Sequence, residues 1–359
     1  MPKVGSNMFD LSHDVKASLQ MGWLTPIASF EAVPGDRFSL SVEHFIRFAP
    51  LVAPVMHRVN VTLHYWFVPN RIVWPQFGEW MGGEIDVTPP YFETTQAVDF
   101  EGKLGDYLGL PKLGTGVRVN ALPFAAYAKI WEEWYRDQNL VASKYKVLNA
   151  GSNPDYLTYA SQEPFRRSWM HDYFTSCLPF AQKGDEVKIP LIQGTTIDVQ
   201  ARPASGPTLV RDPNNGNLRG STNIGTNTQG ELQADGQPSY TDPNGNHFIQ
   251  LDSEASSINT LRRAFRLQEW LERNARGGTR YVELIKSHFG VASPDARQAR
   301  PEYIGGSKGS MVISEVLSTA QTEPTAGNVS NPVGQMAGHG VSMNGSKPMK
   351  YYATEHGWI

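Results

Sequence analysis

Histidine and cysteine are the side chains of this chain that would hold a transition metal. The nine histidines stand at positions 13, 44, 57, 64, 171, 247, 288, 339 and 356. No two of them have the H-x-H or H-E-x-x-H spacing that would place two imidazoles on one side of a strand or helix. The single cysteine, Cys177, excludes a zinc site built on several thiolates. The sequence therefore predicts structural histidines, no metal site and no cofactor.

One serine motif has the form of a hydrolase nucleophile. Residues 305–309 read Gly-Gly-Ser-Lys-Gly and match G-x-S-x-G. In hydrolases this serine lies on a tight turn between a buried strand and a helix. Here Pro301 comes shortly before the motif, and the strand-like run 311–313 follows it. The flanking residues argue against a nucleophilic Ser307, so a serine hydrolase stays an alternative and no catalytic residue is predicted.

The segment 261–280 is the most basic stretch, with six arginines and two glutamates. Arginines beside Trp270 are suited to hold single-stranded nucleic acid through phosphate contacts and base stacking. A solvated helix face with a Glu269–Arg273 pair, or a subunit interface, explains the same pattern. The candidates for nucleic-acid contact are Arg262, Arg263 and Arg266.

Composition limits the class of protein that must position these residues. The chain has 359 residues, 40% hydrophobic and 19% charged, with a formal net charge of −3. These values support a sizeable core and argue against a general polyanion binder. The densest apolar run, residues 48–56, is short and contains two prolines, so no membrane insertion is expected. One cysteine excludes an internal disulfide framework, and we expect a soluble protein of a reducing compartment.

Hydrophobic periodicity predicts short strands and a few helices. Period-two alternation over 38–42 and 59–67 indicates strands with one wet face, and 311–317 and 350–359 are further extended runs. A helix is expected over 120–139, with Asn120 as cap and Pro123 in its first turn. Others are expected over 253–276, capped by Asp252 or Ser253, and over 282–289. An aromatic stripe on the first helix indicates a buried face, with a ligand-stacking site as the alternative: Phe124, Tyr127, Ala128, Trp131, Trp134 and Tyr135.

Two long segments interrupt this pattern. Residues 75–120 contain Gly82-Gly83 and Pro89-Pro90, which indicates an irregular insertion. In 201–250, 30 of 50 residues are Gly, Pro, Asn, Asp, Ser or Thr, so this segment contributes little core. It is either a linker or a surface protrusion. Short strands separated by long connections favour a mainly β sandwich with insertions over a βαβ fold.

A series of short strings is spread in order over nearly the whole chain. The strings are Phe9–Lys16, Val33–Asp36, Arg47–Pro50, Ala53–Val59, Phe67–Arg71, Tyr135–Asn139, Ala275–Tyr281, Ser287–Val291, Ser293–Arg297, Arg300–Tyr303 and Ala337–Gly340. They resemble the major capsid proteins of the microviruses, small single-stranded DNA viruses of bacteria, of the gokushovirus-like type.

The resemblance implies a fold and an assembly. The fold is an eight-stranded antiparallel jelly-roll β-sandwich, with residues 1–359 forming a single capsid domain. Pentamers would build a T=1 icosahedral shell of 60 copies around a circular single-stranded DNA genome. The insertion 201–250 would be surface-exposed and form threefold protrusions, with 75–120 as a second insertion. The protein would be structural, located in the virion and assembled in the host bacterial cytoplasm.

The resemblance also implies partners. These are other copies of the chain, the packaged DNA, a small basic DNA-packaging protein, a pilot protein and a host-cell surface receptor. Family members usually continue past the strand-like end at 356–359, so either the product is longer than this sequence or this family member is unusually short. A jelly-roll module that binds host glycans, or a virion spike, remains the alternative of another class.

Overall fold

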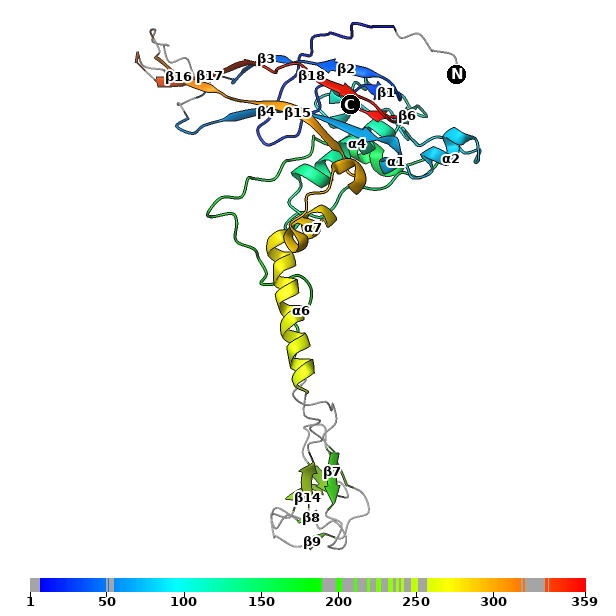
Figure 1. Ribbon diagram of the computed structural model, residues 1–359. Helices are drawn as coiled ribbons and strands as arrows, with labels where there is room; N and C mark the ends of the chain where they lie inside the picture. The colour runs from blue at the N-terminus through cyan, green and yellow to red at the C-terminus, as the bar shows by residue number, and fades with distance from the viewer. Residues whose placement is uncertain are drawn as a thin grey trace. The chain divides into compact units, whose positions relative to one another are not determined.

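The computed structural model describes residues 7–49, 51, 55–188, 257–317, 319, 333–334 and 336–359, and the strands alone between 198 and 250. The chain forms two compact units, Met1–Leu178 with Gly278–Ile359, and Pro179–Gly277. Figure 1 gives the element labels used for both. The first unit holds the larger sheets and the aromatic core.

The sheets of the first unit pair the two ends of the chain in nested order. The pairs are β1 (Glu31–Ala32) with β19 (Gly357–Trp358), β2 (Arg37–Leu40) with β18 (Met349–Tyr352), β3 (Glu43–Arg47) with β17 (Met336–Gly345), and β4 (Asn60–Pro69) with β15 (Glu302–Ser310). Strand β19 also pairs with β4, and β16 (Val312–Leu317) pairs with β17. Figure 1 shows the blue and the orange or red strands lying together. In the sequence, residues 70–301 are therefore inserted between the paired strands β4 and β15.

Every ladder among the described strands is antiparallel, including the small pair of β5 (Tyr91–Glu93) and β6 (Arg118–Asn120). The expected mainly β, antiparallel class is confirmed. Alternation is clear in β4, where Leu63 is buried and its neighbour His64 is exposed. Towards its end, from Trp66 onward, β4 is buried on both faces: Trp66 and Val68 pack against the helices, and Phe67 packs on the other face against Ala32 and Ala353.

Short helices connect these strands. In the first unit they are α1 (Asn70–Val73), α2 (Phe77–Gly82), α3 (Leu104–Tyr107), α4 (Leu122–Ile130), the π-helix η1 (Trp131–Tyr135), α5 (Pro154–Ala160), α7 (Tyr281–Phe289) and the 3-10 helix η2 (Asp295–Gln298). The helix expected over 120–139 is thus α4 continued by η1. Pro123 lies in its first turn as predicted, but the N-cap is Ala121 and not Asn120. Asn120 lies one residue earlier, and its carboxamide oxygen accepts a hydrogen bond from the Leu122 N–H at 2.9 Å.

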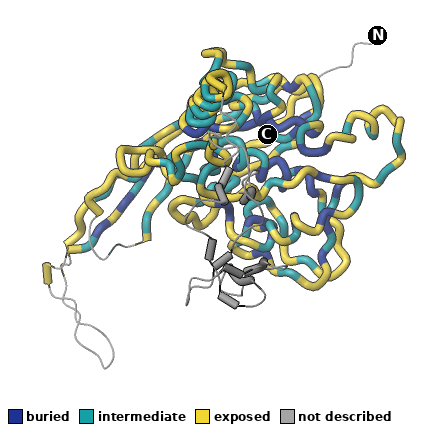
Figure 2. The backbone as a smooth tube through the Cα atoms, turned by 90° about the horizontal axis from the view of Figure 1, so that it is seen from below, coloured by how far each residue is buried: buried dark blue, intermediate teal, exposed yellow. Residues whose placement is uncertain are grey.

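The aromatic stripe of α4 and η1 forms the centre of the main core. Phe124, Trp131 and Tyr135 are buried, and Trp134 is partly buried against Trp66 at 4.6 Å between ring centroids. Figure 2 shows that buried residues gather in this body and that the strands reaching away from it carry many exposed residues. The interpretation of the stripe as a buried helix face is confirmed.

The second unit contains α6 (Ile258–Gly277) and short strands. The expected caps Asp252 and Ser253 lie outside the described residues; α6 begins later, and the Ser257 hydroxyl accepts a hydrogen bond from the Thr260 N–H at 3.2 Å. The helix ends at Gly277, as predicted. The segment 201–250 lies largely outside the described residues. Its strands are β7 (Asp198–Ala201), β8 (Val210–Arg211), β9 (Leu218–Arg219), β10 (Ile224–Thr226), β11 (Leu232–Ala234), β12 (Gln237–Pro238), β13 (Tyr240–Thr241) and β14 (His247–Gln250).

The ladder of β4 and β15 requires a glycine at position 306. A Cβ there would collide with the carbonyl oxygen of Leu63, and it would stand 2.8 Å from the His64 ring and 2.9 Å from the Tyr303 hydroxyl. Backbone carbonyls in a ladder cannot yield as a flexible side chain can. The two strands therefore approach closely only because residue 306 has no side chain.

We expect Gly306→Ala to lower the free energy of unfolding by about 1–3 kcal/mol, because overpacking forces the ladder apart. Urea unfolding followed by tryptophan fluorescence measures the change. Gly114→Ala is the matched control, because a Cβ at Gly114 meets nothing within 4 Å. Equal unfolding midpoints for the two variants would contradict the requirement.

Candidate nucleic-acid interface

A pocket of about 770 Å³ lies beside η1 in the first unit. It is formed by the end of η1, the loop that follows it, and the extended segment 161–169. Lys103 and His171 complete its rim. The side chains that line the pocket determine which kind of ligand it can bind.

Positive charge dominates the lining. Five lysines and arginines face two carboxylates, namely Lys103, Arg136, Lys144, Arg166 and Arg167 against Asp137 and Glu163. Within the described part of the chain, Lys103, Lys144 and Arg166 form no ion pair. These three cations therefore remain available to an anion, and phosphate is one of the anions that Lys and Arg bind well.

Aromatic side chains stand next to these cations. Trp131 and Phe165 are buried and pack edge to face at 5.0 Å between ring centroids. The Lys144 ammonium lies 4.9 Å from the centre of the Phe165 ring. Trp169 is 74% exposed, and its indole N–H donates to Asp172 at 3.3 Å, which fixes the ring. Proteins that bind single-stranded nucleic acid combine cations, which contact the phosphates, with exposed aromatic rings, on which the bases stack.

Hydrogen bonds to η1 hold the extended wall of the pocket in place. The Trp131 indole N–H donates to the Arg166 carbonyl at 2.8 Å, and the Ser168 N–H donates to the Tyr135 carbonyl at 2.7 Å. Tyr135 is the last residue of η1, so its carbonyl has no partner within the helix and is free for such a bond. The Arg167 N–H donates to the Gly22 carbonyl at 2.9 Å. The pocket is therefore built on fixed backbone.

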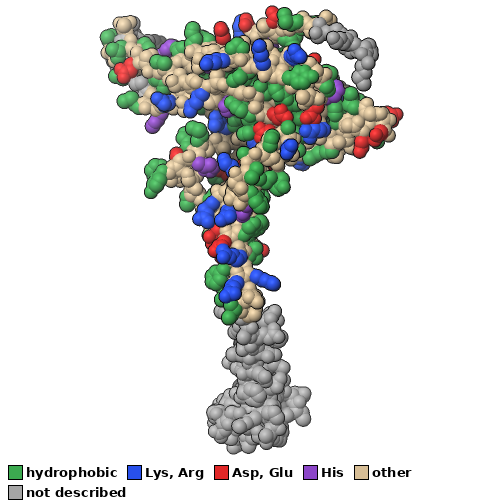
Figure 3. All heavy atoms as spheres, viewed as in Figure 1, with side chains coloured by type: hydrophobic (Ala, Val, Ile, Leu, Met, Phe, Trp, Pro, Cys, Tyr) green, Lys and Arg blue, Asp and Glu red, His purple; other side chains and the backbone are tan. Residues whose placement is uncertain are grey.

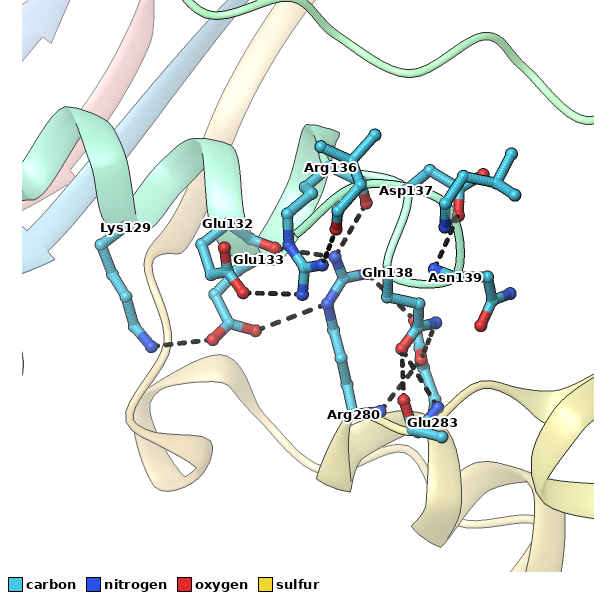
Figure 4. A network of polar contacts seen from close by, with 12 residues as sticks. Lys129, Glu132, Glu133, Arg136, Asp137, Gln138, Asn139, Arg280 and Glu283 are labelled. Atoms are coloured by element: carbon cyan, nitrogen blue, oxygen red, sulfur yellow. Dashed lines mark hydrogen bonds and ion pairs between the residues drawn. The ribbon is translucent and has the colours of Figure 1, made fainter. Parts of the chain in front are cut away.

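A network of polar contacts supports η1 from its other side (Figure 4). The Arg280 guanidinium donates to the Glu132 carbonyl at 2.7 Å and to the Arg136 carbonyl at 3.0 Å, and it pairs with Glu283 at 3.3 Å. Gln138 donates to Glu283 at 2.7 Å and accepts from the Thr279 N–H at 3.1 Å. This network fixes the backbone at the end of η1 onto the start of α7.

Ion pairs one helical turn apart complete this network. Lys129 pairs with Glu133 at 2.8 Å, and Arg136 pairs with Glu132 at 2.7 Å. All four side chains are only 12–19% exposed. Charges this far from solvent are retained only when they are paired, so removing one partner costs more than at an exposed pair.

Tyr135 ends η1 and lies in the core beside the same network. Burial raises the pKa of its phenol to about 12, opposed by the hydrogen bond with Trp66 and by the positive charge of Arg167. Its hydroxyl also contacts the Nδ1 atom of His64. The phenol is therefore neutral at physiological pH and joins β4 to η1.

The predicted nucleic-acid residues lie elsewhere, on α6 of the second unit. Arg262, Arg263 and Arg266 are all exposed, and Arg266 pairs with Glu269 at 2.7 Å. The expected Glu269–Arg273 pair is replaced by this one, because Glu269 also lies one turn after Arg266. Figure 3 shows basic and hydrophobic side chains together along α6. The structure thus places the three arginines on one helix but not in the pocket.

Sequence reasoning missed the pocket because its cations come one or two at a time from residues 103 to 167. The one local signal is Arg166-Arg167 followed closely by Trp169. Ser307 lies in the middle of β15, where it pairs with Leu63 in the ladder. A serine there is not on a strand-to-helix turn, so the geometry of a hydrolase nucleophile is absent.

Other chemistry finds no support among the described residues. They contain no group of three or more His, Cys, Asp or Glu side chains placed to hold a metal ion. None of the described helices is long and apolar enough to cross a membrane. A basic pocket that also carries aromatic side chains has the chemical groups that proteins use to bind single-stranded nucleic acid.

Comparison with known proteins identifies the family. Residues 3–359 match the family model of the phage capsid protein, or F protein, and the chain belongs to this family. It is similar to the capsid protein VP1 of Bdellovibrio phage phiMH2K, with 34% identity over 98% of this chain and 67% of the relative. It is also similar to VP1 of Chlamydia phage 1, with 30% identity over 98% of this chain and 69% of the relative. With VP1 of Spiroplasma virus 4 the identity is 31%, over 87% of this chain and 61% of the relative.

The protein is thus a major capsid protein of the microvirus type, a structural component of the virion and not an enzyme. The hydrolase alternative based on Ser307 is wrong. The chain spans about two thirds of the length of the relatives it matches.

The raised pKa of Tyr135 predicts a loss of stability in alkali. An unfolded tyrosine ionises near pH 10, while folded Tyr135 stays neutral to about 12. Its contribution to stability is therefore complete below pH 10 and is lost as the pH rises towards 12. We expect Tyr135→Phe to reduce the alkaline fall in the free energy of unfolding by roughly 2 kcal/mol.

Urea unfolding at several pH values between 9 and 12 measures this fall. Tyr173→Phe is the control, because Tyr173 is 93% exposed. If both variants follow the wild-type curve over this range, Tyr135 does not titrate as described.

Proposed function

We propose that 60 copies of this chain assemble, through pentamers, into a T=1 icosahedral shell around a circular single-stranded DNA genome. The supporting observation is the match to the phage capsid family over residues 3–359. An antiparallel β-protein with short exposed edges suits shell building, because neighbouring copies cover the apolar surface that one copy leaves exposed. Assembly takes place in the host bacterial cytoplasm.

The shell domain is proposed to be an eight-stranded jelly roll. We assign to it the eight strands β2, β3, β4, β15, β16, β17, β18 and β19, whose nested pairing of early and late strands is the order expected when a long hairpin folds back on itself. Residues 1–359 form one capsid domain in this proposal. The segments 75–120 and 201–250 are insertions into it, and 201–250 forms the threefold protrusions and recognises the host.

The basic pocket is proposed to face the genome. Lys103, Lys144 and Arg166 contact phosphates, and Trp169 stacks on a base. The α6 residues Arg262, Arg263 and Arg266 are a second, independent candidate set. Because the chain carries a net charge of −3, it cannot neutralise the DNA by itself. A small basic DNA-packaging protein supplies that charge, and the pilot protein and a host-cell receptor are the other partners.

Assembly is tested by sedimentation and electron microscopy of the chain produced together with the other virion proteins. We expect uniform shells that contain 60 copies, with free pentamers as the smaller species. A chain that stays monomeric or trimeric and binds host glycans would instead establish the spike alternative.

Removing the free cations of the pocket should weaken binding of single-stranded DNA. In the variant, Lys103, Lys144 and Arg166 are all replaced by alanine. We expect the slope of log affinity against log salt concentration to become less steep by about 2, because each lost phosphate contact contributes about 0.7. Anisotropy of a labelled oligothymidylate at several salt concentrations measures it.

Matched triple variants separate the two sets of cations. Replacing Lys286, Lys347 and Lys350, which are exposed and outside the pocket, should leave the slope nearly unchanged. The alanine variant of Arg262, Arg263 and Arg266 tests the α6 set in the same assay. If only that variant lowers the slope, the genome contact lies on α6 and the pocket assignment is wrong.

A further inference from the structure

The sheet of β16, β17 and β3 has one covered face. On this face Gly338, Gly340 and Ser342 of β17 are buried. A Cβ at Gly340 would collide with the Phe48 ring and would approach the Met311 sulfur to 3.2 Å. The inward face of the sheet is therefore packed against its own chain.

The opposite face of the same sheet is exposed, and part of it is apolar. Phe45 of β3 stands directly across from Met343 of β17, and their exposed fractions are 65% and 76%. In the next row Val312 of β16, which is 69% exposed, lies across from Val341. Apolar side chains placed side by side on three strands form a continuous patch, and such patches mark interaction surfaces.

Charges on β3 flank this patch in a pattern that is complementary to itself. Glu43, Phe45 and Arg47 are exposed and alternate with the partly buried His44 and Ile46, so all three lie on the exposed face. Within the described residues neither Glu43 nor Arg47 forms an ion pair. The face thus reads negative, apolar, positive along the strand. A twofold rotation about Phe45 places each glutamate opposite the arginine of the other copy.

We propose that this face, centred on Phe45, is a twofold contact between two copies of the chain. The two β3 strands lie antiparallel across the axis, with Phe45 and Met343 packed between the sheets. Glu43 of each copy pairs with the partner's Arg47, so the contact contains two equivalent ion pairs. A contact of this kind uses the same patch on both partners, which agrees with a single self-complementary surface.

The inference rests on the proposed shell, because an icosahedral shell has a twofold axis between neighbouring copies. The proposed shell does not say which surface lies on that axis, and the inference assigns the face centred on Phe45 to it. A foreign partner would need its own matching acid and base, whereas a second copy supplies both in the required order. Charge order of this kind fixes register and excludes wrong pairings.

Charge reversal tests the twofold arrangement. Glu43→Arg alone places two arginines opposite each other, and Arg47→Glu alone places two glutamates opposite each other. We expect each single variant to reduce the yield of particles about tenfold, because like charges face each other at both ends of the contact. The double variant E43R/R47E restores opposite charges and should recover most of the wild-type yield.

Cysteine cross-linking supplies a second readout that does not depend on shells. In a Cys177→Ser background, Phe45→Cys should give a disulfide-linked homodimer on mild oxidation, since residue 45 meets its own symmetry mate. Met81→Cys, at a position 50% exposed on α2, is the control and should stay monomeric.

The outcomes separate the inference from the proposed shell. Wild-type shells whose yield is unaffected by either single reversal, with no dimer of the F45C variant, overturn the inference and leave the shell intact. A cross-link from F45C to another virion protein also overturns it. If the wild-type chain forms no shells with its partner proteins, the proposed function fails, and a dimer of F45C would still establish the twofold contact.

Discussion

Hydrogen bonding between the two ends of the chain is the interaction on which the structure of the first unit depends. Strands from residues 31–69 pair in reverse order with strands from residues 302–358. Each ladder brings together residues that are more than 200 positions apart, so its formation must overcome a large loss of chain entropy. The helices of the first unit that follow β4 are therefore positioned beside a ladder that forms only when β15 is present.

The helices α4 and η1 pack against these paired strands, and η1 forms one wall of the basic pocket. Aromatic residues of α4 and η1 fill the space beside β4, and the half-buried ion pairs around Arg280 hold the far side of η1. Because the backbone of η1 is fixed from both sides, the segment 165–168 that bonds to it is fixed as well. The cations of the pocket are consequently displayed from hydrogen-bonded backbone, so in the proposed contact with the genome the protein side would lose little conformational entropy.

Two surfaces of the first unit present charged groups that have no ion-pair partner among the described residues, although the chemistry of the two surfaces differs. In the pocket, cations without carboxylate partners leave positive charge for a polyanion. On the outer face of β3, β17 and β16, apolar residues lie between one free acid and one free base. In both cases the described part of a single chain leaves charges unpaired, and on the sheet face it also leaves apolar side chains exposed. A shell protein has this property because its copies and its genome supply the missing contacts.

Local patterns in the sequence determined much of this protein. Alternation located β2 and β4, Gly277-Gly278 located the end of α6, and ordered strings over the whole chain identified the capsid family. These features depend on residues close together in the chain. Tertiary structure alone decided which strands pair, that the Trp131–Tyr135 turn is a π-helix, and that Lys103 joins Lys144 and Arg166 in one pocket. Such contacts arise from packing between distant segments, and spacing along one chain carries no record of them.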